Sequence, residues 1–445
     1  MTTLAAPFRS RLLLGLLAGF AVLHATAQEK PVAFVGARLL PISGAPIEDG
    51  VVVIQQGKIR AIGPRALTAI PADAERREMA GKVIMPGLVD THSHIGLNSG
   101  GVNERSGPIN PDMRAIDGVD IREPSLQRAR AGGITTVNIM PGSGTLIGGQ
   151  TVYLKLRQGR TIEDLTLTNK SGGIAGGLKM ANGTNPLGDP PFPGTRAKAA
   201  ALVRERYVAA QAYRDKITRA KGDPEKMPAR DLALESLVEA LNGDRVVHHH
   251  THRHDDIVTV LRLKKEFGFR LVLQHVSEGY KVASEIAAAG VPCSVIVIDS
   301  PGGKLEARDM DWKTAGVLER AGVLVGFHTD DSVTDSRLFL RSAALAVRAG
   351  MSPRGALAAV TQAGAKMLDL DGRIGTLDAG KDADFIVLSG DPLSIYSHVE
   401  QTWVEGSKVF DRSDPKDALL ATGGFGAGNP RVCTLCCFGN HGGEQ

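Results

Sequence analysis

The sequence predicts an α/β protein: a (β/α)8 TIM barrel with a small composite β-sandwich formed by both chain ends. Three observations support this prediction. The 445 residues suffice for two to four domains of roughly 100–200 residues each. Apolar runs of strand length alternate with amphipathic helical stretches through the middle of the chain. Short runs rich in valine and isoleucine flank this region on both sides.

The first 27 residues have the pattern of a secretory signal peptide. Arg9 and Arg11 form a basic start, residues 12–23 an apolar run, and Ala27 ends a small-residue cleavage site. The apolar run is short for a membrane span, and no later stretch reaches 18 apolar residues. We therefore expect export to the periplasm or secretion after cleavage near Ala27, with no membrane span in the mature chain. An uncleaved anchor is the alternative.

The β-rich runs at the two ends are expected to form the sandwich. They cover residues 31–40, 50–63, 81–87, 383–391 and 399–410. The predicted domains are then the composite β-sandwich (28–83 with 366–412) and the barrel (84–365). The Gly- and Cys-rich residues 413–445 are expected to be a disordered tail, although Cys433, Cys436, Cys437 and His441 offer an alternative zinc site.

The central region contains eight expected barrel strands, each followed by a loop or helix. They are residues 87–91, 134–140, 151–156, 177–180, 245–250, 270–274, 292–298 and 323–327. Helices are expected over 197–219, 255–267 and 353–368, the last with Ser352 as its cap and Pro353 in its first turn. In barrels of this kind the chemistry lies at the C-terminal ends of the strands.

Composition narrows the class of partner. Hydrophobic residues make up 42% and charged residues 22%, which excludes a disordered chain. Aromatic residues make up 4%, and the net charge is +4, or about +2 without Arg9 and Arg11. We therefore expect a small-molecule or short-peptide substrate and no nucleic-acid partner. A homo-oligomer is compatible with the exposed faces of a barrel.

The most informative motif is VDTHSH at the end of the first expected barrel strand. Residues i and i+2 of a strand lie on the same face, so His92 and His94 present two imidazoles side by side. This spacing is typical of a metal clamp.

Two segments resemble the amidohydrolase superfamily of metal-dependent hydrolases. VIMPGLVDTHSHIG is similar to its first-strand signature, and GTLDAGKDADFIVLSGDP is similar to the strand pair that closes its small β-sandwich. The resemblance covers residues 31–412 and is nearest to the imidazolonepropionase-related and prolidase-like branch. It implies hydrolysis of a carbon–nitrogen bond in an amide, cyclic amide or short peptide.

The resemblance also implies a ligand set. On the fifth strand His248, His250 and His252 share a face and the pattern alone cannot choose, but the family's motif puts the ligand at His250. His275 would be the ligand on the sixth strand. Asp330, with Asp331 and His328 as second choices, would bind metal and carry a proton to the leaving nitrogen.

The fourth strand bears on the number of ions. Binuclear members of the family that this sequence resembles bridge their two ions with a lysine carboxylated by carbon dioxide, and the resemblance implies Lys179 for this role; Lys155 is the rival, and with neither the site is mononuclear. Zn²⁺ is expected, one or two ions, with Mn²⁺, Fe²⁺ or Co²⁺ also fitting the ligands. His252, Arg253 and Lys304 are candidate substrate contacts, while Asp255 and Asp256 resemble helix-capping residues.

Other functions remain open at this point. One is a mononuclear deaminase or imidazolone-type hydrolase, and another is an Xaa-Pro type dipeptidase. A third is an exported, non-catalytic metal-binding protein that uses the histidine run and the cysteine tail.

Overall fold

The computed structural model describes residues 30–97, 102–297 and 304–423. The predicted signal segment and the cysteine cluster lie outside these ranges. Within the described ranges, no helix combines the length and apolar character needed to cross a membrane.

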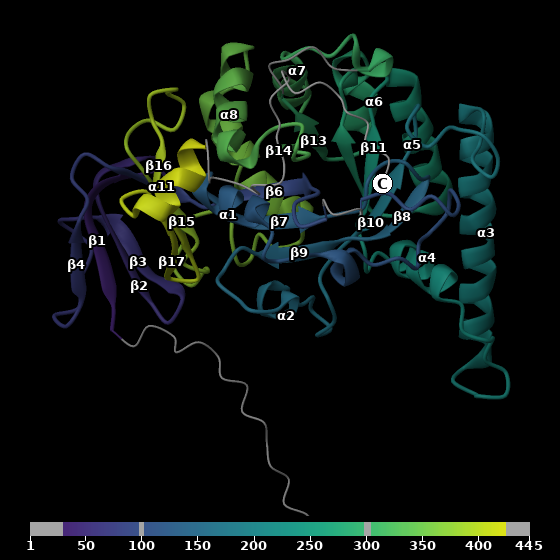
Figure 1. Cartoon of the computed structure of the whole chain (residues 1–445), viewed down its shortest axis with the longest axis horizontal. Coiled ribbons are helices and arrows are strands. Elements are labelled where there is room, and N and C mark those ends of the chain that lie inside the picture. The colour runs from purple at the N-terminus through teal and green to yellow at the C-terminus, as the bar shows by residue number, and fades with distance from the viewer. Residues whose placement is uncertain (1–29, 98–101, 298–303, 424–445) are drawn as a thin grey trace, which may run out of the picture.

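Both ends of the chain contribute strands to one sheet (Figure 1). Its order is β17-β16-β15-β5-β1-β2-β3, with β4 pairing β1. β15 runs antiparallel to β5, with Phe385 opposite Pro86, and the Phe385 ring stacks on Trp403 at a centroid distance of 5.6 Å. The strands are β1 (Val32–Leu39), β2 (Ile47–Gln55), β3 (Lys58–Pro64), β4 (Glu75–Glu78), β5 (Val83–Pro86), β15 (Phe385–Leu388), β16 (Val399–Val404) and β17 (Ser407–Asp411).

The central strands form two further sheets, β6-β7-β9 and β14-β13-β12-β11-β10-β8. Each of the eight predicted strands has a counterpart in the described residues. The strands are β6 (Leu88–Ser93), β7 (Ile134–Ile139), β8 (Ile147–Gln150), β9 (Val152–Lys155), β10 (Leu178–Ala181), β11 (Val247–Thr251), β12 (Leu271–His275), β13 (Cys293–Ile296) and β14 (Val325–His328).

Strands β10 to β14 are parallel, so their C-terminal ends meet at one edge. The structure thus has the α/β character of a TIM-barrel-type fold.

The third predicted strand departs from a regular barrel. β9 runs antiparallel to β7, and β8, which was not expected, runs antiparallel to β10. Parallel neighbours need a crossover connection, usually a helix. The segment between Ile139 and Val152 contains only β8, so the chain turns back instead.

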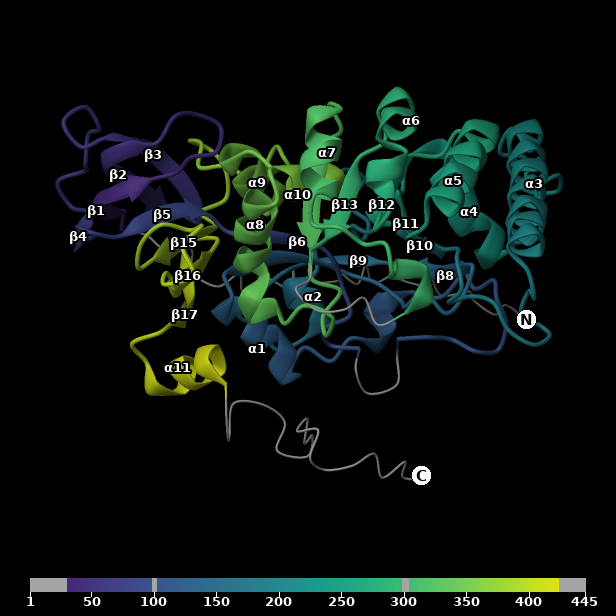
Figure 2. The ribbon, with the colours of Figure 1, turned by 90° about the horizontal axis from the view of Figure 1, so that it is seen from above.

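Helices cover the central strands, and α3, α5, α6 and α7 follow one another along one side (Figure 2). The predicted helix over 353–368 is split, because Thr361 (φ −136°, ψ −91°) leaves the helical region. Residues 415–422 form a helix where a disordered tail was expected. The α-helices are α1 (Pro124–Ala131), α2 (Ile162–Leu165), α3 (Arg196–Ala220), α4 (Leu232–Asn242), α5 (His254–Phe267), α6 (Ala283–Ala288), α7 (Thr314–Arg320), α8 (Phe339–Arg348), α9 (Pro353–Ala359), α10 (Gln362–Met367) and α11 (Pro415–Thr422).

Candidate metal centre

The C-terminal ends of the central strands bring the predicted ligands together. Three groups of three side chains each have their ligand atoms within 4.8 Å of one another. The histidines are buried or nearly so, and the Asp330 side chain is 18% exposed. The groups are His92, His94 and Asp330; His250, His252 and His275; and His92, His275 and His328.

The contact between His94 and Asp330 tests whether a cation fits. His94 Nδ1 donates to the backbone oxygen of Met140 at 2.7 Å, so in a neutral ring Nε2 carries the lone pair. That Nε2 lies 3.0 Å from Asp330 Oδ1, and His92 Nε2 lies 3.4 Å from the same oxygen. A proton on one imidazole could form a hydrogen bond in only one of these two nitrogen–oxygen contacts. A metal ion could be bound by both nitrogens and the carboxylate oxygen together. The donor set therefore fits a divalent ion.

Lys179 lies beside this group. It is fully buried on β10, and its Nζ lies 3.0 Å from His92 Nε2 and 3.1 Å from Met140 Sδ. Among the described residues no carboxylate is paired with it. Burial lowers the pKa of Lys179 to about 7, which favours the neutral amine more than at an exposed lysine.

His250, His252 and His275 form the second group. The His250 and His275 ring centroids are 4.3 Å apart, and those of His252 and His275 are 4.8 Å apart. His252 Nδ1 is 2.7 Å from Ser277 Oγ, while Nε2 of His252 and Nε2 of His275 are buried and have no hydrogen-bond partner among the residues that the structure describes. Burial lowers the pKa values of His250 and His275 well below their usual range, which keeps both rings in the neutral form that binds metal.

Backbone geometry marks the same positions. His275 has φ +70° and Asp330 has φ +49°, in the left-handed backbone region that residues other than glycine rarely adopt. Such conformations persist only where the surroundings impose them, and they cluster at functional sites.

Asp90 supports the site and was not singled out from the sequence. It accepts hydrogen bonds from Thr329 Oγ1 (2.6 Å), Thr329 N (3.1 Å) and His92 N (3.2 Å), which ties β6 to the segment that carries Asp330. Burial raises the pKa of Asp90 to about 7. The available signal was the strand alternation, since Asp90 shares a face with His92 and His94.

His328, a second choice from the sequence, also belongs to the cluster. Its Nδ1 is 2.7 Å from Ser294 Oγ and its Nε2 is 3.1 Å from His275 Nδ1. Asp331 instead accepts from Ser336 N and Ser336 Oγ, away from the histidines.

Three other candidates, Lys155, Arg253 and Lys304, lie apart from the ligand groups. Lys155, the rival bridge, is buried against Asp382 (2.7 Å) and Asp384, so it is an ion-pair partner of the C-terminal segment. Arg253 pairs with Asp255 at 2.8 Å and lines a separate cavity of about 400 Å³.

Lys304 Nζ lies 3.0 Å from Glu306 Oε1 and 3.3 Å from Asn185 Oδ1. Asn185 is in turn 3.5 Å from His250 Nε2, which leaves Lys304 two contacts away from the cluster. Asp256 lies in the first turn of α5, where it pairs with Arg196.

An α/β fold with imidazoles and a carboxylate at its strand ends is the arrangement of a metal-binding hydrolase. A model of the amidohydrolase family matches residues 83–410. A solved amidohydrolase structure from Thermotoga maritima MSB8 is 34% identical, with a TM-score of 0.80, and the match covers 86% of this chain and 100% of that one. The chain therefore belongs to the amidohydrolase family, and it is a hydrolase acting on carbon–nitrogen bonds.

Two curated relatives differ in how much of them is matched. An imidazolonepropionase from Deinococcus radiodurans is 27% identical over 77% of this chain and 86% of its own length. The amidohydrolase tasK from Hapsidospora irregularis is 28% identical over 81% of this chain. That match spans only 40% of tasK.

Proposed function

We propose that this chain is an exported metal-dependent amidohydrolase that hydrolyses the carbon–nitrogen bond of an amide, a cyclic amide or a short peptide. The observation that carries the proposal is the pair of imidazole nitrogens, His94 Nε2 and His92 Nε2, facing one oxygen of Asp330. Export, to the periplasm or the medium, rests on the signal pattern in residues 1–27.

The proposed architecture is a closed barrel over residues 84–365 with a composite sandwich from 28–83 and 366–412. Contacts of the first central strand, β6, with β13 and with the segment that follows β14 support closure. Asp330 N donates to His92 O at 2.9 Å, and the hydroxyl groups of Thr91 and of Ser294 on β13 form a hydrogen bond of 2.6 Å.

In this proposal His92, His94 and Asp330 hold one ion, and His250 and His275 hold a second. Lys179, carboxylated by carbon dioxide, would be the bridging ligand, because it is buried 3.0 Å from His92 and no carboxylate of the described residues is in ion-pair contact with it. Nitrogen-rich ligands favour Zn²⁺, with Mn²⁺, Fe²⁺ and Co²⁺ as alternatives. A bound divalent ion supplies Lewis acidity, which polarises the scissile carbonyl and activates water.

The chain's own groups would manage the proton. Asp330 is partly exposed at the strand ends, so its carboxylate can take the proton of the attacking water and pass it to the leaving nitrogen. The Asp90–Thr329 hydrogen bonds hold the backbone that positions Asp330. His252 and Lys304 remain the proposed substrate contacts, whereas Arg253 would first have to leave Asp255.

The decisive experiment is a turnover screen of the metal-loaded full chain. The substrates are N-acyl amino acids, dipeptides including Xaa-Pro, and cyclic amides, with Asp330→Asn as the matched inactive variant. We expect hydrolysis of at least one class and its loss in the variant. Equal activity of the variant, or no turnover of any carbon–nitrogen substrate, contradicts the proposal.

The similarity to an imidazolonepropionase favours a second candidate, a mononuclear deaminase or imidazolone-type hydrolase. Metal content per chain separates the two. Two equivalents that fall to about one in Lys179→Met support the bridging lysine. A fully active protein with one equivalent, unchanged in Lys179→Met, supports the mononuclear enzyme.

A further inference from the structure

A relay of side-chain hydrogen bonds leads away from His275 into the centre of the strands. His275 Nδ1 lies 3.1 Å from His328 Nε2, and His328 Nδ1 lies 2.7 Å from Ser294 Oγ. The Ser294 hydroxyl is in turn 2.6 Å from the hydroxyl of Thr91. The four side chains come from four strands, β12, β14, β13 and β6, and each is at most 1% exposed. The relay is therefore closed to bulk water.

The two ring nitrogens of His275 have different surroundings. Nδ1 faces His328, and the nearby Asp330 Oδ2 is 4.0 Å away, beyond hydrogen-bond distance. Nε2 is buried and has no hydrogen-bond partner among the described residues. Nε2 is thus the nitrogen that His275 has free for an ion. A neutral imidazole carries one hydrogen, so a cation at Nε2 places that hydrogen on Nδ1.

The hydrogen on His275 Nδ1 then sets the direction of the relay. Burial lowers the pKa of His328 to about 3, so its neutral ring has one donor and one acceptor. Nε2 of His328 accepts from His275, which leaves the hydrogen of His328 on Nδ1, where it donates to Ser294 Oγ. Metal-binding histidines usually donate their second nitrogen to a carboxylate, a backbone carbonyl or water. An imidazole can take that place in only one tautomer, and the Ser294 oxygen favours this tautomer.

Direct binding of an ion by His328 is the competing role. His92, His275 and His328 have ligand atoms within 4.8 Å of one another. The His328 ring, however, stacks on His92, with centroids 4.9 Å apart and 19° between the planes. Imidazole lone pairs lie in the ring plane, so stacked rings do not direct theirs at one ion. An ion shared by His328 Nε2 and His275 Nδ1 would also leave His275 Nε2 without a partner.

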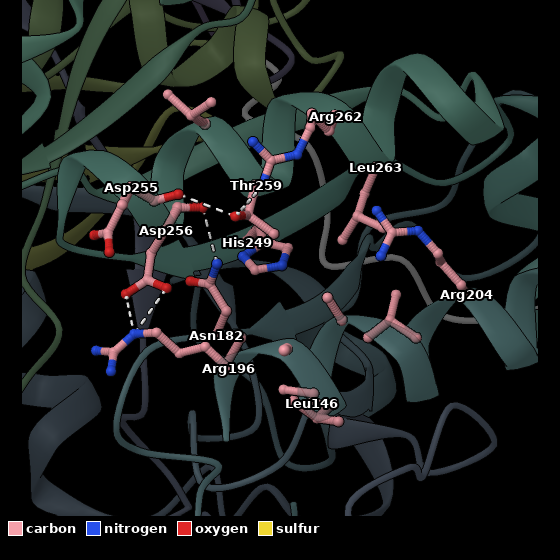
Figure 3. A pocket seen from close by; sticks show the side chains of 16 residues that line it. Leu146, Asn182, Arg196, Arg204, His249, Asp255, Asp256, Thr259, Arg262 and Leu263 are labelled. Carbon is pink, nitrogen blue, oxygen red and sulfur yellow. Dashed lines mark hydrogen bonds and ion pairs between the residues drawn. The ribbon is translucent and has the colours of Figure 1, made fainter.

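Burial alone does not produce such a relay, as His249 shows. Its side chain is 1% exposed, but successive residues of β11 face opposite sides, so it points away from the face that carries His250. It lines a cavity of about 620 Å³ between α3 and α5 (Figure 3). Its Nδ1 lies 2.9 Å from the backbone oxygen of His250, a contact within its own strand. His249 is therefore a buried imidazole outside the relay.

We propose that His328 is a positioning residue and not a metal ligand: it accepts from His275 Nδ1 and, with Ser294, holds His275 in the tautomer whose Nε2 binds an ion. The inference rests on the proposed metal centre, because it assigns an ion to His275. It adds two side chains that bind no metal themselves to the groups on which metal affinity depends.

Competition for Zn²⁺ between the full chain and a chromophoric chelator tests the proposal. Ser294→Ala removes the acceptor of His328 Nδ1, and His328→Leu removes the acceptor of His275 Nδ1. His328→Gln keeps an amide that can accept near the position of the ring Nε2. The matched controls are His249→Leu and Ser236→Ala, the latter removing a buried hydroxyl of α4 that also has a 2.7 Å hydrogen bond. The absorption spectrum of the Co²⁺-loaded chain is the second measurement.

We expect Ser294→Ala and His328→Leu to weaken the binding of one Zn²⁺ about 10–100-fold. His328→Gln should recover most of this loss, and both controls should bind Zn²⁺ like the parent chain. The Co²⁺ spectrum of His328→Gln should match that of the parent, because the same atoms bind the ion.

Two results overturn the inference while leaving the metal centre in place. One is unchanged Zn²⁺ affinity in Ser294→Ala and His328→Leu. The other is a shifted Co²⁺ spectrum in His328→Gln, which would make His328 a ligand. A parent chain that binds no Zn²⁺ instead overturns the proposed metal centre, and this inference with it. If His328→Leu fails to fold, the smaller change Ser294→Ala still decides.

Discussion

Replacing Lys155 with methionine should destabilise the chain strongly, although Lys155 takes no part in the metal centre. The Lys155 side chain is 1% exposed and lies between Asp382 (2.7 Å) and Asp384 (2.5 Å), each 2% exposed. The variant leaves two buried carboxylates without their shared cation. Breaking a buried ion pair by removing one partner costs about 3–5 kcal/mol.

Lys58 offers a matched control, because it contacts the same carboxylate from the surface. Its Nζ is 2.5 Å from Asp382 Oδ1, but its side chain is 49% exposed. We expect Lys58→Met to cost less than about 1 kcal/mol.

Urea unfolding followed by tryptophan fluorescence measures both changes, since Trp403, one of the two tryptophans, lies in the sheet next to β15. Adding Asp384→Asn to Lys155→Met should recover part of the loss. Equal losses for the two lysine variants would refute the reasoning from burial.

Four further predictions follow from the structure. Asp330→Asn should reduce kcat about 10²–10⁴-fold, measured on whichever substrate the screen identifies; a smaller effect would remove Asp330 from proton transfer. Chelation should lower Tm, because an ion present at about 1,000 times its Kd contributes about 4 kcal/mol; a melting curve unchanged by chelator argues against a resident ion. Gly176→Ala should cost about 1–3 kcal/mol in urea unfolding, because its Cβ would lie 1.9 Å from Thr151 O; a neutral effect would mean that the segment before β10 shifts freely. Burial raises the pKa of Asp382, but its ion pairs with Lys155, Lys58 and Arg373 outweigh this and lower the pKa to about 2 from an unfolded value near 3.8, so their stabilisation is complete above about pH 4 and is lost as pH falls through 2. Asp382→Asn should therefore lose less stability than the parent chain between pH 5 and pH 3, and parallel losses would contradict that assignment.

Much of the candidate site could be predicted because the residues that form it follow strand periodicity. His92 and His94 are two residues apart at the end of β6, and His275 is the last residue of β12. The structure brings these residues together with His250, Lys179 and Asp330, while their roles as ligands remain predictions. Periodicity could not separate Lys179 from Lys155, since both sit in apolar strands. The two lysines differ in contacts that are distant in the sequence: Lys155 pairs with Asp382 and Asp384, whereas Lys179 lies next to His92.

The misses have a similar origin. β9 pairs antiparallel with β7, and β8 pairs antiparallel with β10. These pairings depend on strands elsewhere in the sequence, so the local pattern of residues 147–155 does not predict them. The break at Thr361 interrupts a stretch whose composition favours one continuous helix. Arg253 is predicted as a substrate contact by its position after β11; in the structure it pairs with the adjacent Asp255, and its role stays a prediction.

The sheet shared by both chain ends also constrains how the protein is made. Pro86 of β5 pairs with Phe385 of β15, so nearly 300 residues must be synthesised before this edge of β5 is covered. At about 5–20 residues per second, the wait is roughly 15–60 s. Throughout it, the N-terminal strands present an unpaired edge and their part of an apolar core, both of which promote aggregation. Nascent or truncated chains that end before β15 should therefore be the species that depend most on a chaperone.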